Sequence, residues 1–344
     1  MLLFDPQPLE KTDYLFLEST YGNRNHKDDE NSLDELANAI ERSYKLGGKV
    51  IIPTFAVERA QEIIYSLYLI HRRGQLPKNM PIYLDSPLAI KATEVFERYK
   101  DDLDFHEIKN DMPSIADFDF KVNYTLGTEE SQALNAMEGP AIILSASGMC
   151  NAGRIKHHLK HNIWRPETSI VFVGFQAVGT LGRKIVEGAT SVSLMNNDLN
   201  VSAKIYTING FSAHAGQNQL LDWVSTIAKC KPHIILIHGE KSAQEELGRL
   251  IKEKYALDVT IPAYLDEIEL TAKASDDEQV ALSLAKHAIP KLDWQFVFDD
   301  LDLRFKQLHN KLDHVQERSW EDQTEIHDKV AKLNNDLYKL IAQL

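Results

Sequence analysis

Short apolar runs rich in β-branched residues alternate along this chain with stretches of helical periodicity, and this alternation constrains the fold more than any other feature. Several runs are almost continuously apolar, as in strands buried on both faces. The predicted strands cover residues 14–17, 50–53, 82–84, 141–144, 170–173, 204–208 and 233–237. Helical patterns lie between and after them at residues 31–44, 57–71, 90–99, 155–161, 217–227 and 243–255. Such alternation predicts an α/β architecture.

The pattern changes near the carboxyl end, where no strand and no glycine follow residue 278 and Pro290 is the single proline. Apolar residues recur there at alternating spacings of four and three, which predicts two helices with narrow apolar seams. The seams consist of Leu301, Phe305, Leu308, Leu312 and Val315, and of Ile326, Val330, Leu333, Leu337, Leu340 and Leu344. They could pack together as a helical hairpin within the chain, or pair with a second chain to form a homo-oligomer.

Composition excludes several classes of protein. With 43% hydrophobic and 26% charged residues, the 344-residue chain has ordinary globular composition. A net charge of −13 argues mildly against a nucleic-acid binder, unless a local basic cleft or bound metal ions supply positive charge. The only cysteines, Cys150 and Cys230, form no Cys-x-x-Cys pair, which argues against a disulfide framework or a cysteine zinc site. The sequence shows no signal peptide and no membrane helix, so we expect a cytoplasmic protein without membrane contact.

Three ionisable side chains stand at strand ends or helix starts, where α/β proteins place their sites. Glu18 ends the first predicted strand, and its carboxylate could orient a histidine, bind a metal or cap nearby amides. His214 begins a predicted helix and could act as an acid, a base or a ligand, or be a satisfied histidine. His238 ends a buried strand before Gly239, which suits a zinc site but is a weak signal alone.

A fourth segment is rich in small hydroxyl residues and glycine. Ser145, Ser147 and Gly148 follow a predicted strand, and Arg154 precedes the next predicted helix. Accessible amides near a helix start, with a neighbouring cation, could cradle a phosphodiester. An ordinary loop between a strand and a helix is an equally good interpretation.

The order of the motifs is more specific than their spacing. The chain reads Glu-Ser-Thr-Tyr-Gly from Glu18, Pro-Thr-Phe-Ala-Val-x-Arg-x-Gln from Pro53 and Asp-Ser-Pro-Leu-Ala from Asp85. There follow Ser-x-Ser-Gly-Met, Gly-Phe-Gln, Gly-Thr-Leu-Gly-Arg, Phe-Ser-Ala-His-Ala and His-Gly-Glu. Over residues 1–270 this series resembles the β-CASP family, in its RNA-processing type related to the nuclease subunit of the cleavage and polyadenylation factor.

The resemblance implies a domain organisation. In the family, a small α/β cassette interrupts an αββα metallo-β-lactamase sandwich, and the active site lies between the two. We therefore expect a partial αββα sandwich at residues 1–25 and 163–270, an inserted β-CASP α/β cassette at residues 26–162, and a helical C-terminal tail at residues 271–344.

The resemblance also implies roles for individual residues. Glu18, His214 and His238 match the family's motifs A, B and C. His238 is then a zinc ligand, His214 the acid that protonates the leaving oxygen, and Glu18 the group that orients His214. Substrate phosphate would be bound by Ser145, Ser147, Gly148 and Arg154.

The sequence departs from the family at two points. Gly216 stands where the family usually has an aspartate, and the His-x-His-x-Asp-His motif of the superfamily occurs nowhere in the chain. Intact relatives hold two zinc ions, and most of those ligands are absent here. We therefore expect the amino-terminal part of the family's fold to be missing from this sequence, and the chain alone to be inactive.

The expected function is a zinc-dependent hydrolase of RNA phosphodiesters, with endonuclease and 5′-exonuclease action both open and RNA as the partner. One alternative is a DNA nuclease of the same superfamily, although such relatives usually lack a histidine at the position of His238. The other is an inactive truncated chain that binds RNA or a partner subunit.

Overall fold

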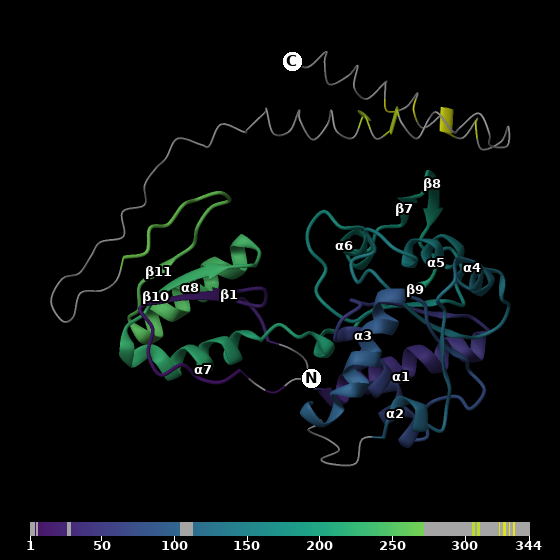
Figure 1. Ribbon diagram of the computed structural model, residues 1–344, viewed down its shortest axis with the longest axis horizontal. Helices are drawn as coiled ribbons and strands as arrows, with labels where there is room; N and C mark the ends of the chain where they lie inside the picture. The colour runs from purple at the N-terminus through teal and green to yellow at the C-terminus, as the bar shows by residue number, and fades with distance from the viewer. Residues whose placement is uncertain are drawn as a thin grey trace. The chain divides into compact units, whose positions relative to one another are not determined.

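The computed structural model describes residue 4 and residues 6–25, 29–103 and 113–271, together with single positions between 305 and 333. The chain divides into two compact units, Met1–Pro262 and Ala263–Leu344. The first unit contains all the strands described below (Figure 1).

The larger sheet of the first unit has six parallel strands in the order β4-β3-β5-β2-β6-β9. The central strands are apolar and fully buried, as expected for parallel strands covered on both faces. The strands are β2 (Val50–Pro53), β3 (Ile82–Leu84), β4 (Val122–Tyr124), β5 (Ile142–Ser145), β6 (Ser169–Phe172) and β9 (Lys204–Thr207).

Helices cover both faces of this sheet (Figure 1). Because side chains alternate along a strand, Val50 and Ile52 of β2 belong to one core and Ile51 to the other. The first core includes apolar residues of α1 (Asp29–Leu46), α2 (Arg59–Arg72) and α3 (Pro87–Arg98). The second includes residues of α4 (Thr128–Ala136), α5 (Ile155–Asn162), α6 (Leu181–Val186) and β7 (Ser191–Leu194), which pairs with β8 (Asn197–Asn200).

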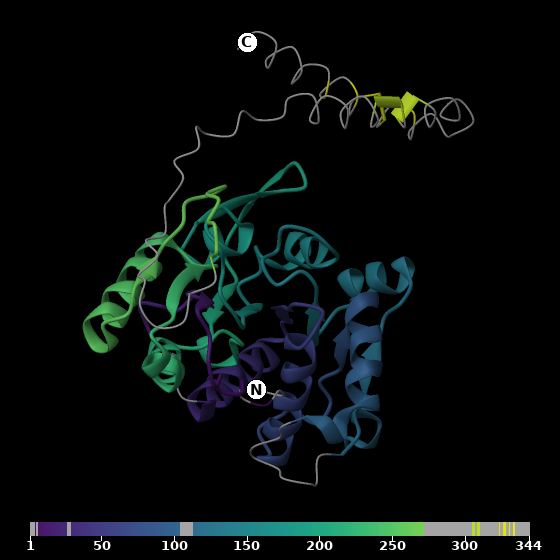
Figure 2. The same ribbon diagram turned by 60° about the vertical axis from the view of Figure 1, so that its left-hand side comes forward.

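A smaller parallel sheet has the order β1-β10-β11. It consists of β1 (Tyr14–Glu18), β10 (His233–Ile237) and β11 (Val259–Thr260). Leu15, Leu17, Ile234 and Leu236 share a core with apolar residues of α7 (Gln217–Ile227) and α8 (Lys241–Tyr255). The alternate side chains Phe16 and Ile237 are 49% and 39% exposed, so the opposite face of this sheet is only partly covered. Figure 2 shows the same unit turned, with α7 and α8 brought forward.

All seven predicted strands and the six helices predicted between residues 31 and 255 are present, with ends shifted by at most three residues. The sequence did not predict β4, β7, β8, β11, α4 or α6. These elements are short, and β8 is entirely polar apart from Leu199, so the sequence contains no apolar run that indicates a strand or helix at these positions. Pairing with a neighbouring strand or packing on the sheet decides their conformation.

The expected cassette boundary at residue 162 falls between β5 and β6, and both of these strands pair with β2. The six-stranded sheet thus extends past this boundary, through β6 to β9. Most of the two apolar seams of the tail lies outside the described residues; Phe305, Leu308, Ile326, Val330 and Leu333 are helical positions. Among the described helices, none combines the length and the apolarity needed to cross a membrane.

Candidate active site

The two parallel strands β1 and β10 bring their carboxyl ends to the same edge of the small sheet. Glu18 at the end of β1 pairs in register with Ile237, so His238 is the next residue beyond it. An isolated bridge between Tyr21 and Gly216 then brings the start of α7 to the same place. As a result, one ligand atom each from Glu18, His214 and His238 lies within 4.8 Å of the others, and no other such cluster occurs among the described residues.

Glu18 is fixed by backbone donors from two different segments. The amide of Thr20 donates to Oε2 at 2.9 Å, and the amide of Ala215 donates to Oε1 at 3.1 Å. Nδ1 of His214 lies 3.4 Å from Oε2. Burial raises the pKa of Glu18, but the hydrogen bonds from His214 and Thr20 outweigh it and leave the pKa below its ordinary value. Glu18 is therefore an ionised group that holds the imidazole of His214.

Thr20 contacts His238 at two atoms. Its Oγ1 lies 3.2 Å from the backbone carbonyl oxygen of His238 and 3.0 Å from Nδ1 of the same residue. A threonine hydroxyl has a single hydrogen, so when that hydrogen is donated to the carbonyl, Nδ1 is the donor in the second contact. In the neutral ring Nε2 then carries the lone pair and is the atom available to a metal ion.

Close backbone packing holds the end of β10 against β1. His238 has a φ of 51°, in the left-handed region, and its carbonyl accepts a hydrogen bond from the amide of Ser19 at 3.1 Å. A Cβ on Gly239 would lie 2.6 Å from Oγ and 2.7 Å from the carbonyl oxygen of Ser19. Only glycine fits there, which explains the His-Gly pair recognised in the sequence.

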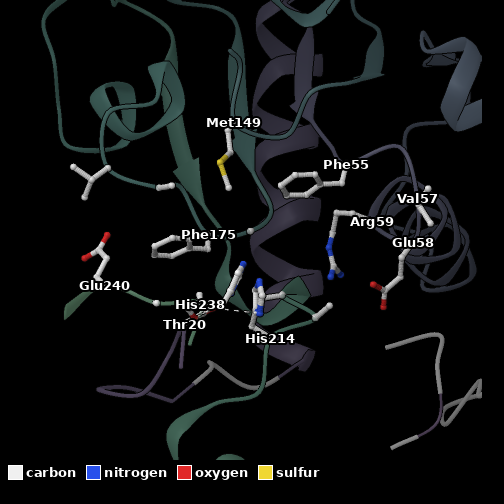
Figure 3. Close-up of a pocket in the computed structure, with 16 residues that line it drawn as sticks. Thr20, Phe55, Val57, Glu58, Arg59, Met149, Phe175, His214, His238 and Glu240 are labelled. Carbon is white, nitrogen blue, oxygen red and sulfur yellow. Dashed lines mark hydrogen bonds between the residues drawn. The ribbon is translucent and has the colours of Figure 1, made fainter. Parts of the chain in front are cut away.

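The two imidazole rings lie 5.0 Å apart in a stacked arrangement and line a pocket of about 560 Å³. This volume is in the range of small-molecule sites. In the view of Figure 3, Met149 and Phe55 lie across the pocket from the two imidazole rings, and Phe175 lies beside His238. The remaining lining residues are Thr20, Val57, Glu58, Arg59, Gly174, Ala177, Val178, Ser212, Ala213, Gly239 and Glu240.

The residues expected to bind phosphate do not line this pocket, although the neighbouring Met149 does. Ser145 is fully buried, and its hydroxyl donates to the backbone carbonyl of Asp85 at 2.9 Å. Ser147 donates to the carbonyl of Ala152 within its own loop. Gly148 is buried, and its carbonyl accepts from Gln176. None of these three residues, nor Arg154, lines the pocket, and phosphate binding by them stays a prediction.

Arg154 is engaged in a buried polar network around Asp85. Its guanidinium donates to Oδ1 of Asp85 at 2.8 Å and to the carbonyls of Thr125 and Leu126. Asp85 is fully buried and also accepts from His158, Thr125 and Ser131. Burial raises the pKa of Asp85, but its hydrogen bonds lower the pKa by a larger amount, so that it is about 2. The hydrogen bonds from His158, Ser131 and Thr125 therefore stabilise this carboxylate, and Arg154 forms an ion pair with it.

Most of the pocket lining was not predicted from the sequence, including Thr20, Phe55, Arg59 and Phe175. Thr20 stands two residues after Glu18, and its position in the Glu-Ser-Thr motif was the one available signal. Phe55 and Arg59 lie in the Pro-Thr-Phe-Ala-Val-x-Arg motif, which indicates the family but by itself indicates no chemical role for these two residues. Only the fold shows that this motif faces the two histidines.

The fold and the site together define the class: an α/β protein of two parallel sheets with a His-His-Glu cluster at the strand ends of one of them. Residues 60–185 match the Beta-Casp domain, and residues 198–262 match the Zn-dependent metallo-hydrolase RNA specificity domain. The chain belongs to the β-CASP family of metallo-β-lactamase-fold proteins.

Curated relatives match across both domains. Ribonuclease TTHA0252 of Thermus thermophilus is 39% identical over 257 residues, which cover 73% of this chain and 57% of that protein. Transcription termination factor FttA of Methanothermobacter thermautotrophicus is 35% identical over 272 residues, covering 74% and 41%. The same factor of Thermococcus kodakarensis is 34% identical over 284 residues, covering 78% and 43%. The chain thus spans between 41% and 57% of the length of these relatives.

Proposed function

We propose that the chain carries part of the active site of a zinc-dependent hydrolase that cleaves RNA phosphodiesters. The observation that carries the proposal is the convergence of Glu18, His214 and His238, of which the two histidines line one pocket. The names of the relatives, a ribonuclease and transcription termination factors, support RNA as the substrate.

The donor chemistry of the site fits zinc, because imidazole and carboxylate groups are its common ligands. The hydrogen bond to Thr20 leaves Nε2 of His238 available to the metal and orients the ring, as metal-binding histidines require. Glu18 already accepts two amide hydrogen bonds and contacts His214, so it is better placed to orient that histidine than to bind the ion. When bound, zinc supplies Lewis-acid polarisation of the phosphoryl oxygen.

His214 is the proton donor in this proposal. Its Nδ1 faces Glu18, and its ring stacks beside that of His238. Glu18 stabilises the protonated imidazole, which can then give a proton to the oxygen that leaves the phosphorus. Edge-to-face contact with Tyr21, at a ring separation of 6.3 Å, fixes the ring from another side.

A catalytic zinc usually has three protein ligands, and two-zinc sites have more. In this proposal Glu18 orients His214 and His214 donates a proton, so His238 is the ligand that remains in the cluster. One ligand is fewer than the three that a catalytic zinc usually has. We therefore propose that these 344 residues are not sufficient for hydrolysis. Binding of RNA or of a partner subunit without cleavage is the second candidate function, and the partly covered face with Phe16 and Ile237 favours it.

The test has two arms. The first measures zinc content and cleavage of labelled single-stranded RNA by the 344-residue chain, where we expect less than one zinc per chain and no cleavage. The second joins the chain to a metallo-β-lactamase half that supplies His-x-His-x-Asp-His, where we expect cleavage that His214→Ala and His238→Ala both abolish. The chimera should cleave RNA in preference to matched DNA.

Two outcomes contradict the proposal in different ways. Full loading with two zinc ions and His214-dependent cleavage by the chain alone would show that the ligand set is sufficient. A correctly folded chimera that cleaves DNA as well as RNA would favour the DNA nuclease. The variant His71→Ala, in α2 and outside the pocket, controls for the general effect of removing a histidine.

A further inference from the structure

One wall of the pocket is the turn that joins β2 to α2. Phe55, Val57 and Glu58 come from this turn, Arg59 is the first residue of α2, and all four line the pocket. The turn follows a fully buried strand and precedes a helix of 14 residues, so both of its ends are anchored in the core. Side chains on such a turn are held in place before a ligand arrives.

Phe55 presents an aromatic ring to this pocket. It is 46% exposed, although the strand that leads to it is completely buried. Its ring is supported from behind by Gly148, where a Cβ would lie only 3.0 Å from Cδ2. The supported ring leaves an aromatic surface open to the pocket, which is the arrangement on which an unpaired nucleobase can stack.

Among the described residues that line the pocket, Arg59 is the one basic side chain other than histidine. It is 5% exposed, and Nη1 forms an ion pair with Glu62 in the first turn of α2. In Figure 3 its guanidinium points toward the side of the pocket where His214 lies. An arginine has five N–H donors in a rigid fork, so the pair with Glu62 leaves donors for a second anion.

We propose that Phe55 and Arg59 form a subsite for one unpaired nucleotide, with the base stacked on Phe55 and the phosphate bound by Arg59. This inference rests on the proposed function, because it assigns a place in the pocket to RNA. The subsite would let a chain with a net charge of −13 bind an anionic strand, because the positive charge that contacts the phosphate lies inside the pocket and not on a basic surface. A base-paired nucleotide has no free face for Phe55, so the subsite selects single strands.

The base contact is tested by equilibrium binding of a short single-stranded RNA that carries 2-aminopurine, whose fluorescence is quenched by stacking. The 344-residue chain is compared with Phe55→Leu, which keeps an apolar side chain but removes the ring. We expect affinity to fall about tenfold or more, with loss of quenching. The matched control is Trp164→Leu, because Trp164 is an aromatic residue exposed to a similar degree, 47%, and does not line the pocket.

The phosphate contact is tested by the salt dependence of the same binding. The double variant Arg59→Gln, Glu62→Gln removes the buried pair together, so that no unpaired charge is left in the core. We expect the slope of log affinity against log salt to decrease by about 0.7, the value for one phosphate contact on a single strand. Arg249→Gln on α8, an arginine paired with Glu246 and Glu253 on the surface, should leave the slope unchanged.

The outcomes separate this inference from the proposed function. Tight RNA binding that survives both the Phe55 and the Arg59 variants overturns the subsite and leaves RNA as the substrate. No RNA binding by the unmodified chain, with or without zinc, overturns both. Circular dichroism and thermal unfolding of each variant establish that a loss of affinity does not come from unfolding.

Discussion

Oγ1 of Thr20 lies 3.0 Å from Nδ1 of His238 and 3.2 Å from the backbone carbonyl oxygen of the same histidine. One hydroxyl therefore positions the ring, and donation of its single hydrogen to the carbonyl would assign the ring proton to Nδ1. Oγ1 also lies 3.4 Å from Nδ1 of His214, so Thr20 contacts both histidines of the cluster.

The first prediction concerns this hydroxyl. Thr20→Val keeps the shape of the side chain but removes the acceptor for Nδ1 of His238, so zinc affinity should fall about 10- to 100-fold. Nitrogen-15 NMR of the neutral ring should show protonated Nδ1 in the unmodified chain and a mixture of tautomers in the variant. Thr20→Ser retains the hydroxyl and should behave like the unmodified chain; equal tautomers in all three would contradict the assignment.

The second prediction separates the two arginines. Arg154→Gln leaves the fully buried Asp85 without its cationic partner, so the free energy of unfolding should fall by about 3 kcal/mol. The salt dependence of RNA binding should not change, because Arg154 does not line the pocket. Urea denaturation measures the first effect. If the variant is as stable as the unmodified chain but binds RNA less tightly, the phosphate role expected from the sequence is restored.

The third prediction concerns Glu58, which has a φ of 68° and a carboxylate that lines the pocket. Such a conformation is costly for a residue with a side chain, so Glu58→Gly should raise the free energy of unfolding by about 1 kcal/mol. Loss of the negative charge should also strengthen RNA binding. Glu58→Gln keeps the strained backbone and removes the charge, so it should improve binding without improving stability.

The fourth prediction is a pH dependence that comes from Asp85. Its pKa is about 2 in the folded protein against 3.8 as the ordinary value, so folding favours the ionised form. The stability that this provides, about 2 kcal/mol, is fully present above pH 4 and is lost as the pH falls toward 2. Urea unfolding between pH 2 and pH 6 should show this loss. Asp85→Asn should flatten the curve in that window, and an unchanged curve would contradict the prediction.

The fifth prediction concerns the tail. If the apolar seams at residues 301–315 and 326–344 pair two chains, deletion of residues 290–344 should convert a dimer into a monomer. Light scattering coupled to gel filtration measures the mass of both forms. The same number of chains per particle with and without the tail would favour a hairpin within one chain.

The sequence by itself determined the architecture of the first unit, because buried parallel strands are continuous apolar runs and the helices between them have clear periodicity. Val50–Pro53 and Gln217–Ile227 appear with the predicted ends. The sequence also determined which ionisable residues stand at strand ends, and Glu18, His214 and His238 do converge. Strand order places the ends of β1 and β10 together, which the motif order anticipated.

Only the tertiary structure decided which polar residues face the pocket. Ser145 and Arg154 are residues of the types found in phosphate sites. In the fold both donate hydrogen bonds to Asp85, which lies 60 and 69 residues away in the sequence. The motif that contains Phe55 and Arg59 indicates only a connection from a strand to a helix. In the fold both residues line the same pocket as the two histidines. Local sequence sets the chemistry of each side chain, whereas long-range packing decides its partner, because burial satisfies some polar groups within the core and leaves others open to a ligand.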